Sequence, residues 1–132
     1  MKWIFLLPAF VFALHGQAHA AVYQKSFDLT CVSNSCAALL PKVAANKTLI
    51  IDTVSCVAIA NTAVTGGIGV FTVKGNTDFF QYFKLERTHA GVLVVNVERV
   101  PATVKAGKQI ELQLGADAAI AGASCSLRGT IK

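Results

Sequence analysis

Histidine is the side chain that would most readily supply acid or base chemistry near neutral pH, and the 132-residue chain has three of them. Two lie in the first twenty residues, so His89 is the only histidine in the rest of the chain. A Ser-His-Asp hydrolase would have to combine His89 with Asp52 or Asp78. The chain has no Gly-x-Ser-x-Gly motif, and Gly91 follows His89 closely. We therefore expect His89 to lie exposed in a turn, and a small hydrolase that uses it is the least favoured function.

Carboxylates offer a second kind of chemistry, because paired acids cleave glycosidic bonds and clustered acids bind cations. The seven acidic residues are Asp28, Asp52, Asp78, Glu86, Glu98, Glu111 and Asp117. Their spacing predicts neither a catalytic pair nor a calcium loop. Asp52 interrupts an apolar run, and we expect its side chain on the outward face of a strand or near a strand end. We predict no metal site, no cofactor and no catalytic residue, and we expect that the protein is not an enzyme.

Four cysteines make up the rest of the reactive inventory: Cys31, Cys36, Cys56 and Cys125. An even number of cysteines in an exported chain indicates disulfides, here in one of three pairings. We favour Cys31–Cys36, because the residues between them (Val-Ser-Asn-Ser) suit a turn, and this leaves Cys56–Cys125. Structural zinc sites use two close pairs of ligands, whereas only one pair is close here, so zinc is not expected.

The N-terminal residues have the features of an export signal. After a short positive start, Trp3–Leu14 is an uncharged apolar run, and small residues at Ala18 and Ala20 suit signal peptidase. A run of 12 residues is too short to span a bilayer, which takes about 20. We expect residues 1–20 to be a cleaved signal peptide and residues 21–132 to be one disulfide-bonded domain. The protein would then be secreted or periplasmic, from a bacterium, with no transmembrane segment.

Alternation of apolar and polar residues predicts the elements that must position these groups. Ile110, Leu112 and Leu114 alternate with polar residues, which indicates a half-buried strand. Leu93, Val95 and Val97 alternate in the same way, and Leu49–Ala60 is apolar on both faces, as in a central strand. Turn residues recur every 8–12 residues. We expect an all-β fold, an antiparallel β-sandwich of jelly-roll or immunoglobulin-like type with seven or eight strands.

One segment, Asn76–Arg87, fits either a strand or a short helix, and we favour a strand because it is rich in Phe and Tyr. In a strand, Phe83 and Leu85 would point inward. The formal net charge of +5 is modest, and no specific nucleic-acid motif is present. Exposed aromatic residues near positive charges would form a weak site for an anionic glycan or nucleic acid. The candidate ligand-binding residues are Phe80, Tyr82, Lys84 and Arg87.

The composition, with 54% hydrophobic and 14% charged residues, excludes a charge-rich disordered chain. The first hypothesis for function is an exported, non-enzymatic binding or structural module. The second is a subunit of a homo-oligomer or fibre, since the apolar residues of Leu49–Ala60 with Phe80 and Tyr82 exceed the needs of one core. The plan of a signal and a small disulfide-bonded β-domain resembles subunits of chaperone-assembled surface fibres in composition, although the end of this chain, Cys125–Lys132, has no aromatic residue.

Overall fold

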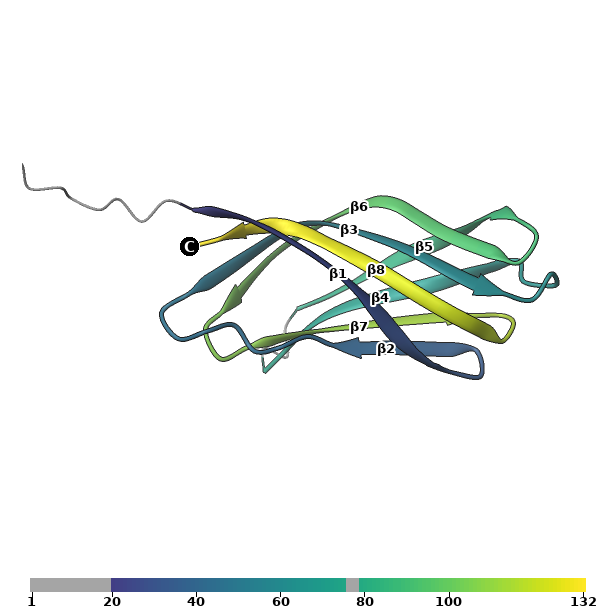
Figure 1. The fold of residues 1–132 in the computed structure, drawn as a ribbon, viewed down its shortest axis with the longest axis horizontal. Coiled ribbons are helices and arrows are strands. Elements are labelled where there is room, and N and C mark those ends of the chain that lie inside the picture. The colour runs from purple at the N-terminus through teal and green to yellow at the C-terminus, as the bar shows by residue number, and fades with distance from the viewer. Residues whose placement is uncertain (1–19, 76–78) are drawn as a thin grey trace, which may run out of the picture.

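A computed structural model describes residues 20–75 and 79–132, which fold into eight β-strands (Figure 1). The strands are β1 Ala21–Val32, β2 Ser35–Leu39, β3 Thr48–Ala60, β4 Gly66–Lys74, β5 Phe80–His89, β6 Val92–Lys105, β7 Gln109–Ala116 and β8 Ile120–Ile131. The described residues contain no helix. The all-β prediction and the number of strands are confirmed.

All neighbouring strands are antiparallel, and they close into a barrel in the order β1-β2-β7-β4-β5-β6-β3-β8. The predicted sandwich is therefore confirmed only in part, because hydrogen bonds continue around the whole ring and the strands form a closed barrel. Two of the pairings are short: β1 meets β2, and β5 meets β6, over three residue pairs each. These two short seams join a four-stranded layer β1-β8-β3-β6 to a second layer β2-β7-β4-β5.

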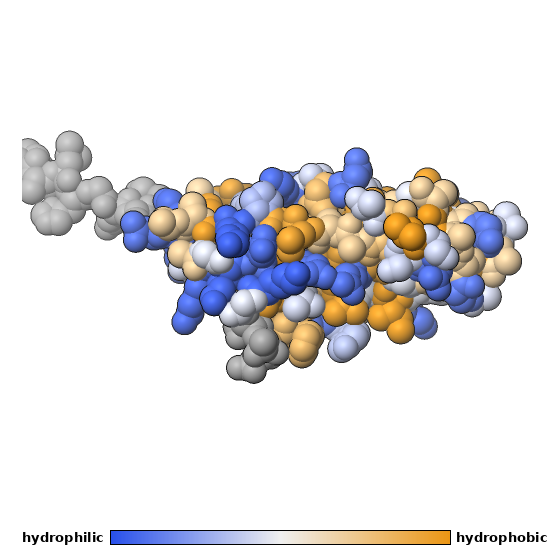
Figure 2. Space-filling model, turned by 90° about the horizontal axis from the view of Figure 1, so that it is seen from below, coloured by the Kyte–Doolittle hydropathy of each residue, from blue (hydrophilic) through white to orange (hydrophobic). Residues whose placement is uncertain are grey.

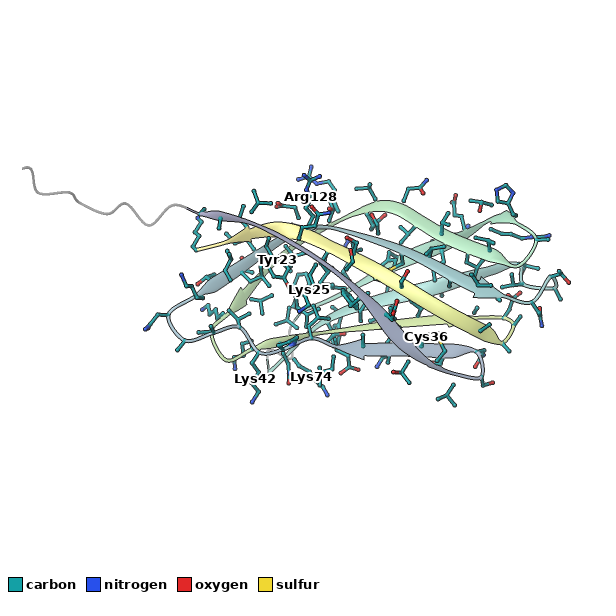
Figure 3. All side chains as sticks on the ribbon, viewed as in Figure 1. Tyr23, Lys25, Cys36, Lys42, Lys74 and Arg128 are labelled. Atoms are coloured by element: carbon teal, nitrogen blue, oxygen red, sulfur yellow. A yellow bond between two sulfur atoms is a disulfide. The ribbon has the colours of Figure 1, made fainter. Side chains whose placement is uncertain are left out.

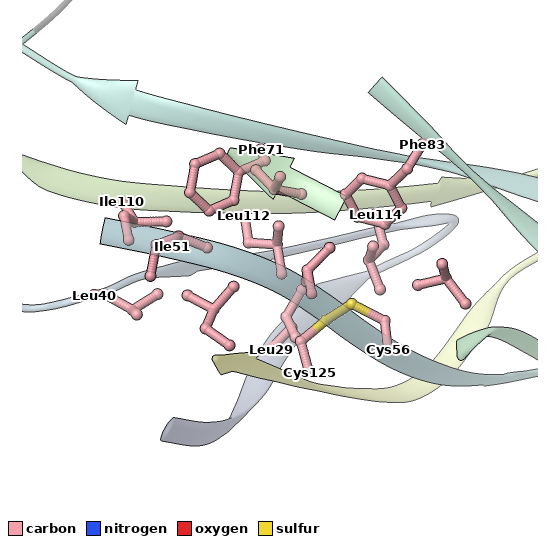
Figure 4. Close-up of a cluster of buried hydrophobic side chains, with 14 of the residues drawn as sticks. Leu29, Leu40, Ile51, Cys56, Phe71, Phe83, Ile110, Leu112, Leu114 and Cys125 are labelled. Carbon is pink, nitrogen blue, oxygen red and sulfur yellow. A yellow bond between two sulfur atoms is a disulfide. The ribbon is translucent and has the colours of Figure 1, made fainter. Parts of the chain in front are cut away.

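The barrel interior is apolar, and no described polar or charged side chain is buried. Ile110, Leu112 and Leu114 on β7 are buried as their alternation predicted, and they pack near Phe71 of β4 (Figure 4). Phe83 of β5 lies over Gly69 of β4, where a β-carbon would overlap the ring. A bare glycine therefore makes room for a large aromatic side chain in the core.

Bulges change the alternation along β3 and β6. Val97 was expected inward with Leu93 and Val95, but it is 67% exposed. Opposite Ser55 of β3, two residues of β6 take the place of one, so the inward side chains of β6 change from odd to even positions beyond Val95. β6 has a second bulge, which contains Pro101. The regular hydrogen bonding between strands is interrupted there, so the missing backbone N–H of proline does not cost a hydrogen bond of the sheet.

Both predicted disulfides are present: Cys31–Cys36 and Cys56–Cys125. Cys31 and Cys36 lie opposite each other across β1 and β2, beside the turn that joins these strands. Cys56 and Cys125 are opposite each other in the β3–β8 ladder, and both are buried in the core (Figure 4). The second disulfide therefore connects two central strands of one layer.

The prediction of a strand in Asn76–Arg87 is confirmed for the described part, since β5 begins at Phe80; residues 76–78 lie outside the described residues. Phe83 and Leu85 are buried, as expected for a strand. Near the short seams, the two outer strands of the β1-β8-β3-β6 layer each carry a charged residue at a position that alternates with the outward ones. These are Lys25 of β1, which Figure 3 shows on the β2 side of its strand, and Glu98 of β6.

Candidate binding surfaces

The structure brings together three of the four residues predicted to bind a ligand. Phe80, Tyr82 and Lys84 share the outward face of β5, and the two aromatic side chains are 59% and 68% exposed. Arg87 occupies an odd position of the same strand and therefore shares the phase of Phe83, on the other face. The alternation of side chains along β5 thus separates Arg87 from Phe80, Tyr82 and Lys84, and its part in ligand binding stays a prediction.

The neighbouring strand β4 extends this surface with apolar residues. Val70 lies opposite Tyr82, and Ile68 lies opposite Lys84. We call Ile68, Val70, Phe80 and Tyr82 the β5 aromatic patch. A groove of about 460 Å³ borders the patch at the seam between β5 and β6, where exposed Val97 faces it. Seen from below, apolar residues lie beside hydrophilic ones on the surface of the molecule (Figure 2).

The residues of the hydrolase hypothesis are not brought together. His89 is exposed at the end of β5 and pairs with Val92, as expected for a residue beside a turn. Asp52 is exposed on β3, near Val100 of β6, so about eight strand residues, roughly 25 Å, separate the two. Asp78 lies outside the described residues. The outward placement predicted for Asp52 is confirmed.

No group of three or more histidine, cysteine or carboxylate side chains that could hold a metal ion occurs in residues 20–75 and 79–132. In the same part of the chain, no helix has the length and apolar character needed to cross a bilayer.

Four strands contribute polar side chains to one row on the outward face of the other layer. Ser26 of β1 lies opposite Ser126 of β8, which lies opposite Ser55 of β3. The Ser55 hydroxyl donates to the backbone carbonyl oxygen of Asn96 on β6, and Ser26 and Ser126 bring their hydroxyl oxygens to 3.4 Å. We call Ser26, Ser126, Ser55 and Asn96 the serine row.

A shallow groove of about 510 Å³ runs along the serine row. Asp28 and Ser124, which are opposite each other on β1 and β8, border it, and Val57 lies next to Ser124. The Cys56–Cys125 disulfide lies directly beneath, because each cysteine is next to a serine of the row in sequence. Hydroxyl, amide and carboxylate groups thus converge on a stretch of sheet that is covalently cross-linked.

A second polar row lies two residues from the first along β1, β8 and β3, and three residues from it along β6. Thr53 of β3 is opposite Arg99 of β6 on one side and Arg128 of β8 on the other, and Arg128 is in turn opposite Gln24 of β1 (Figure 3 labels Arg128). We call these four residues the arginine row. Both arginines are exposed, and among the described residues neither makes an ion pair.

Two carboxylates have lowered pKa values, each for a local structural reason. The Asp117 carboxylate accepts hydrogen bonds from the Thr65 hydroxyl and from the backbone N–H groups of Thr65 and Gly66, and the Thr65 hydroxyl contributes most to the lowered pKa. Lys74 approaches Glu111 to 3.1 Å, and its hydrogen bond is the main cause of the lowered pKa of Glu111. These acids hold strand ends and neighbouring strands in place, so we interpret them as structural groups.

Sequence reasoning missed both polar rows. Ser126 and Arg128 alternate in sequence with buried Cys125 and Leu127, and this local pattern is enough to place the two polar side chains outward. Their partners come from β1, β3 and β6, and only the register of the strands shows which residue lies beside which.

The chain matches no known protein-family model and no curated protein sequence. Among solved structures, it is similar to a chain in the cryo-EM structure of the virus-like particle of extra small virus from the giant freshwater prawn Macrobrachium rosenbergii. The sequences are 11% identical, the TM-score is 0.37, and the match covers 99% of this chain and 89% of that one. A likeness at this level says nothing of what the present chain binds.

Proposed function

We propose that this chain is an exported, non-enzymatic binding module that presents its ligand site on the outward face of the β1-β8-β3-β6 layer. The observation that carries the proposal is the groove along the serine row, where side chains from four strands converge above a disulfide. A rigid sheet that displays fixed polar groups is suited to binding, because its groups lose little freedom when a ligand arrives.

The fold assignment within this proposal is a jelly roll. Strands pair in the combinations β1 with β8, β2 with β7, β3 with β6, and β4 with β5. A long antiparallel ribbon that is folded once and rolled up would make these four pairings, and a jelly roll has eight strands in two layers. In this assignment the short seams are the two places where one layer passes into the other.

Export is the second part of the proposal. Two disulfides, with all four cysteines paired, support an oxidising compartment. Residues 1–20 would then be a cleaved signal peptide and residues 21–132 the exported domain, either in a bacterial periplasm or outside the cell.

The test of binding uses the full chain, expressed with its N-terminal segment in a secretion-competent host and labelled with ¹⁵N. A panel of neutral oligosaccharides, acidic oligosaccharides and short peptides is titrated while the backbone amide signals are followed. We expect one class to shift the amides of Ser26, Ser55 and Ser126 together. Shifts confined to other strands would overturn this placement of the site, and chemical turnover of a probe that a single polar substitution abolishes would overturn the non-enzymatic assignment.

A second candidate function is self-assembly, and the β5 aromatic patch favours it. Phe80 and Tyr82 are more than half exposed, and contiguous exposed apolar surface marks interaction sites. The test compares Tyr82→Ser with Thr72→Ser, a change of an outward residue on the neighbouring strand β4, by light scattering at increasing concentration. We expect oligomers that Tyr82→Ser dissociates and Thr72→Ser leaves intact, whereas a monomer at every concentration would contradict assembly.

A further inference from the structure

The arginine row has the geometry of an anion site. Thr53 lies between Arg99 and Arg128 on adjacent strands, so the two arginine backbones are separated by two strand spacings, about 10 Å. Arginine side chains are long enough to bring both guanidinium groups over Thr53 from the two sides. Each guanidinium offers planar N–H donors that match carboxylate or sulfate oxygens, and the Thr53 hydroxyl adds a donor between them.

The charges around this row are mixed, and their placement matters. Gln24, at the end of the row, is neutral. Asp52 is exposed next to Thr53, at a point where β3 has one residue more than β8, and Asp28 lies beyond the serine row. Glu98 shares the phase of the buried residues of β6. The surface therefore passes from positive at the arginines, through neutral hydroxyl groups, to negative at Asp28.

We propose that the arginine row and the serine row together bind an acidic polysaccharide. A carboxylate or sulfate of the polysaccharide lies between Arg99 and Arg128. The hydroxyl groups of the adjoining sugar lie along the serine row, where Asp28 accepts hydrogen bonds from them. The rows are two residues apart along β1, β8 and β3, about 7 Å, which suits consecutive groups on one glycan. This inference rests on the proposed function, because it names the ligand class of the same face.

A glycan explains the surface better than a nucleic acid does. Single-stranded nucleic acids gain affinity by stacking bases on aromatic side chains, but exposed Phe80 and Tyr82 lie on β5, in the other layer. A glycan, in contrast, has hydroxyl groups that donate hydrogen bonds to carboxylate and serine oxygens.

The test measures binding of four probes of matched length by calorimetry with the full exported protein: a polyuronate, a sulfated dextran, neutral dextran and a single-stranded oligonucleotide. We expect the polyuronate, the sulfated dextran or both to bind, and the comparison of these two identifies the acidic group. Affinity falls with added salt, because the contact is ionic. Arg99→Gln and Arg128→Gln each weaken binding about tenfold.

Three variants give the matched controls. Arg87→Gln removes the same charge from β5 and leaves affinity unchanged, whereas Asp52→Asn removes a nearby negative charge and tightens binding. Ser126→Ala weakens binding to acidic and neutral probes alike. Thermal melts followed by circular dichroism confirm that each variant is folded.

Four results would overturn the inference. If Arg87→Gln weakens binding as much as Arg99→Gln, the attraction is a property of total charge. If the oligonucleotide binds more tightly than either acidic glycan, the ligand class is wrong. If neutral dextran binds as tightly as the acidic probes and the arginine changes have no effect, the proposed binding face stands while its acidic specificity fails. Absence of binding to all four probes overturns this inference. The proposed binding face is then tested by the peptides of the titration described under the proposed function.

Discussion

The two disulfides are expected to contribute unequally to stability, and the sequence separations allow the difference to be worked out. Cys56 and Cys125 are 69 positions apart, whereas Cys31 and Cys36 are 5 apart. In the chain-entropy model, closing the long loop stabilises by about 4 kcal/mol and closing the short loop by about 2 kcal/mol. Cys56 and Cys125 are also both buried, so their replacement by alanine additionally leaves unfilled core volume.

The assay is urea unfolding of two double variants, Cys56→Ala/Cys125→Ala and Cys31→Ala/Cys36→Ala, in which no unpaired thiol remains. The chain's one tryptophan is Trp3, in the predicted signal, so far-ultraviolet circular dichroism is the signal of choice. We expect the free energy of unfolding to fall by at least about 2 kcal/mol more in the first variant than in the second. Equal losses, or a larger loss in the second variant, would refute this reasoning.

Two further predictions concern close packing and pH. Gly129→Ala should lower the free energy of unfolding by about 3 kcal/mol, because the new β-carbon would overlap the backbone of β3, while Gly122→Ala, which meets open space, should change it by less than about 0.5 kcal/mol in the same urea titration. Asp117→Ala should lower the melting temperature at pH 6. Because the pKa of Asp117 is lowered in the folded state, its carboxylate stabilises the fold above the unfolded-state pKa, and this stabilisation is lost as the pH falls through the folded-state pKa. The difference in melting temperature from wild type should therefore narrow at pH 2.5. A constant difference would show that Thr65 is not held by the ionised carboxylate.

Local pattern was enough to predict the strands, because side-chain alternation depends only on neighbours in sequence. Ile110, Leu112 and Leu114 are buried for this reason, and the short turn-like spacing of Cys31 and Cys36 sufficed for the disulfides. The predicted inward orientation of Val97 was wrong, because its orientation depends on a bulge that appears only when β6 is paired with β3.

Closure of the barrel and the composition of the polar rows depend on pairing between distant segments. Ser26 and Ser126 are neighbours only because β1 pairs with β8 in one particular register. A shift by one residue would turn every side chain of a strand to the opposite face, so no property of either segment alone predicts the row. The shared face of Phe80, Tyr82 and Lys84 was easier to predict, since these residues lie on one strand, where alternation also places Arg87 on the other face.

The short seams bear on how the two candidate functions relate. Lys25 and Glu98 put charges near the partly unpaired edges of β1 and β6, and Pro101 and two bulges interrupt β6 further. Inward charges, proline and bulges are features that keep strand edges from pairing with other chains. Assembly is therefore expected through the outward face of the β2-β7-β4-β5 layer, where the β5 aromatic patch lies, and ligand binding through the opposite layer.

The two proposed functions can then be tested separately by substitution, because their candidate surfaces lie on different layers of one barrel. Tyr82→Ser should dissociate oligomers without changing the affinity for an acidic glycan, and Arg128→Gln should weaken glycan binding without changing the mass measured by light scattering. Sites on separate strands with no shared partner are expected to act independently. Loss of both properties in either variant would mean that the two faces are coupled, and that the face-by-face division of function is wrong.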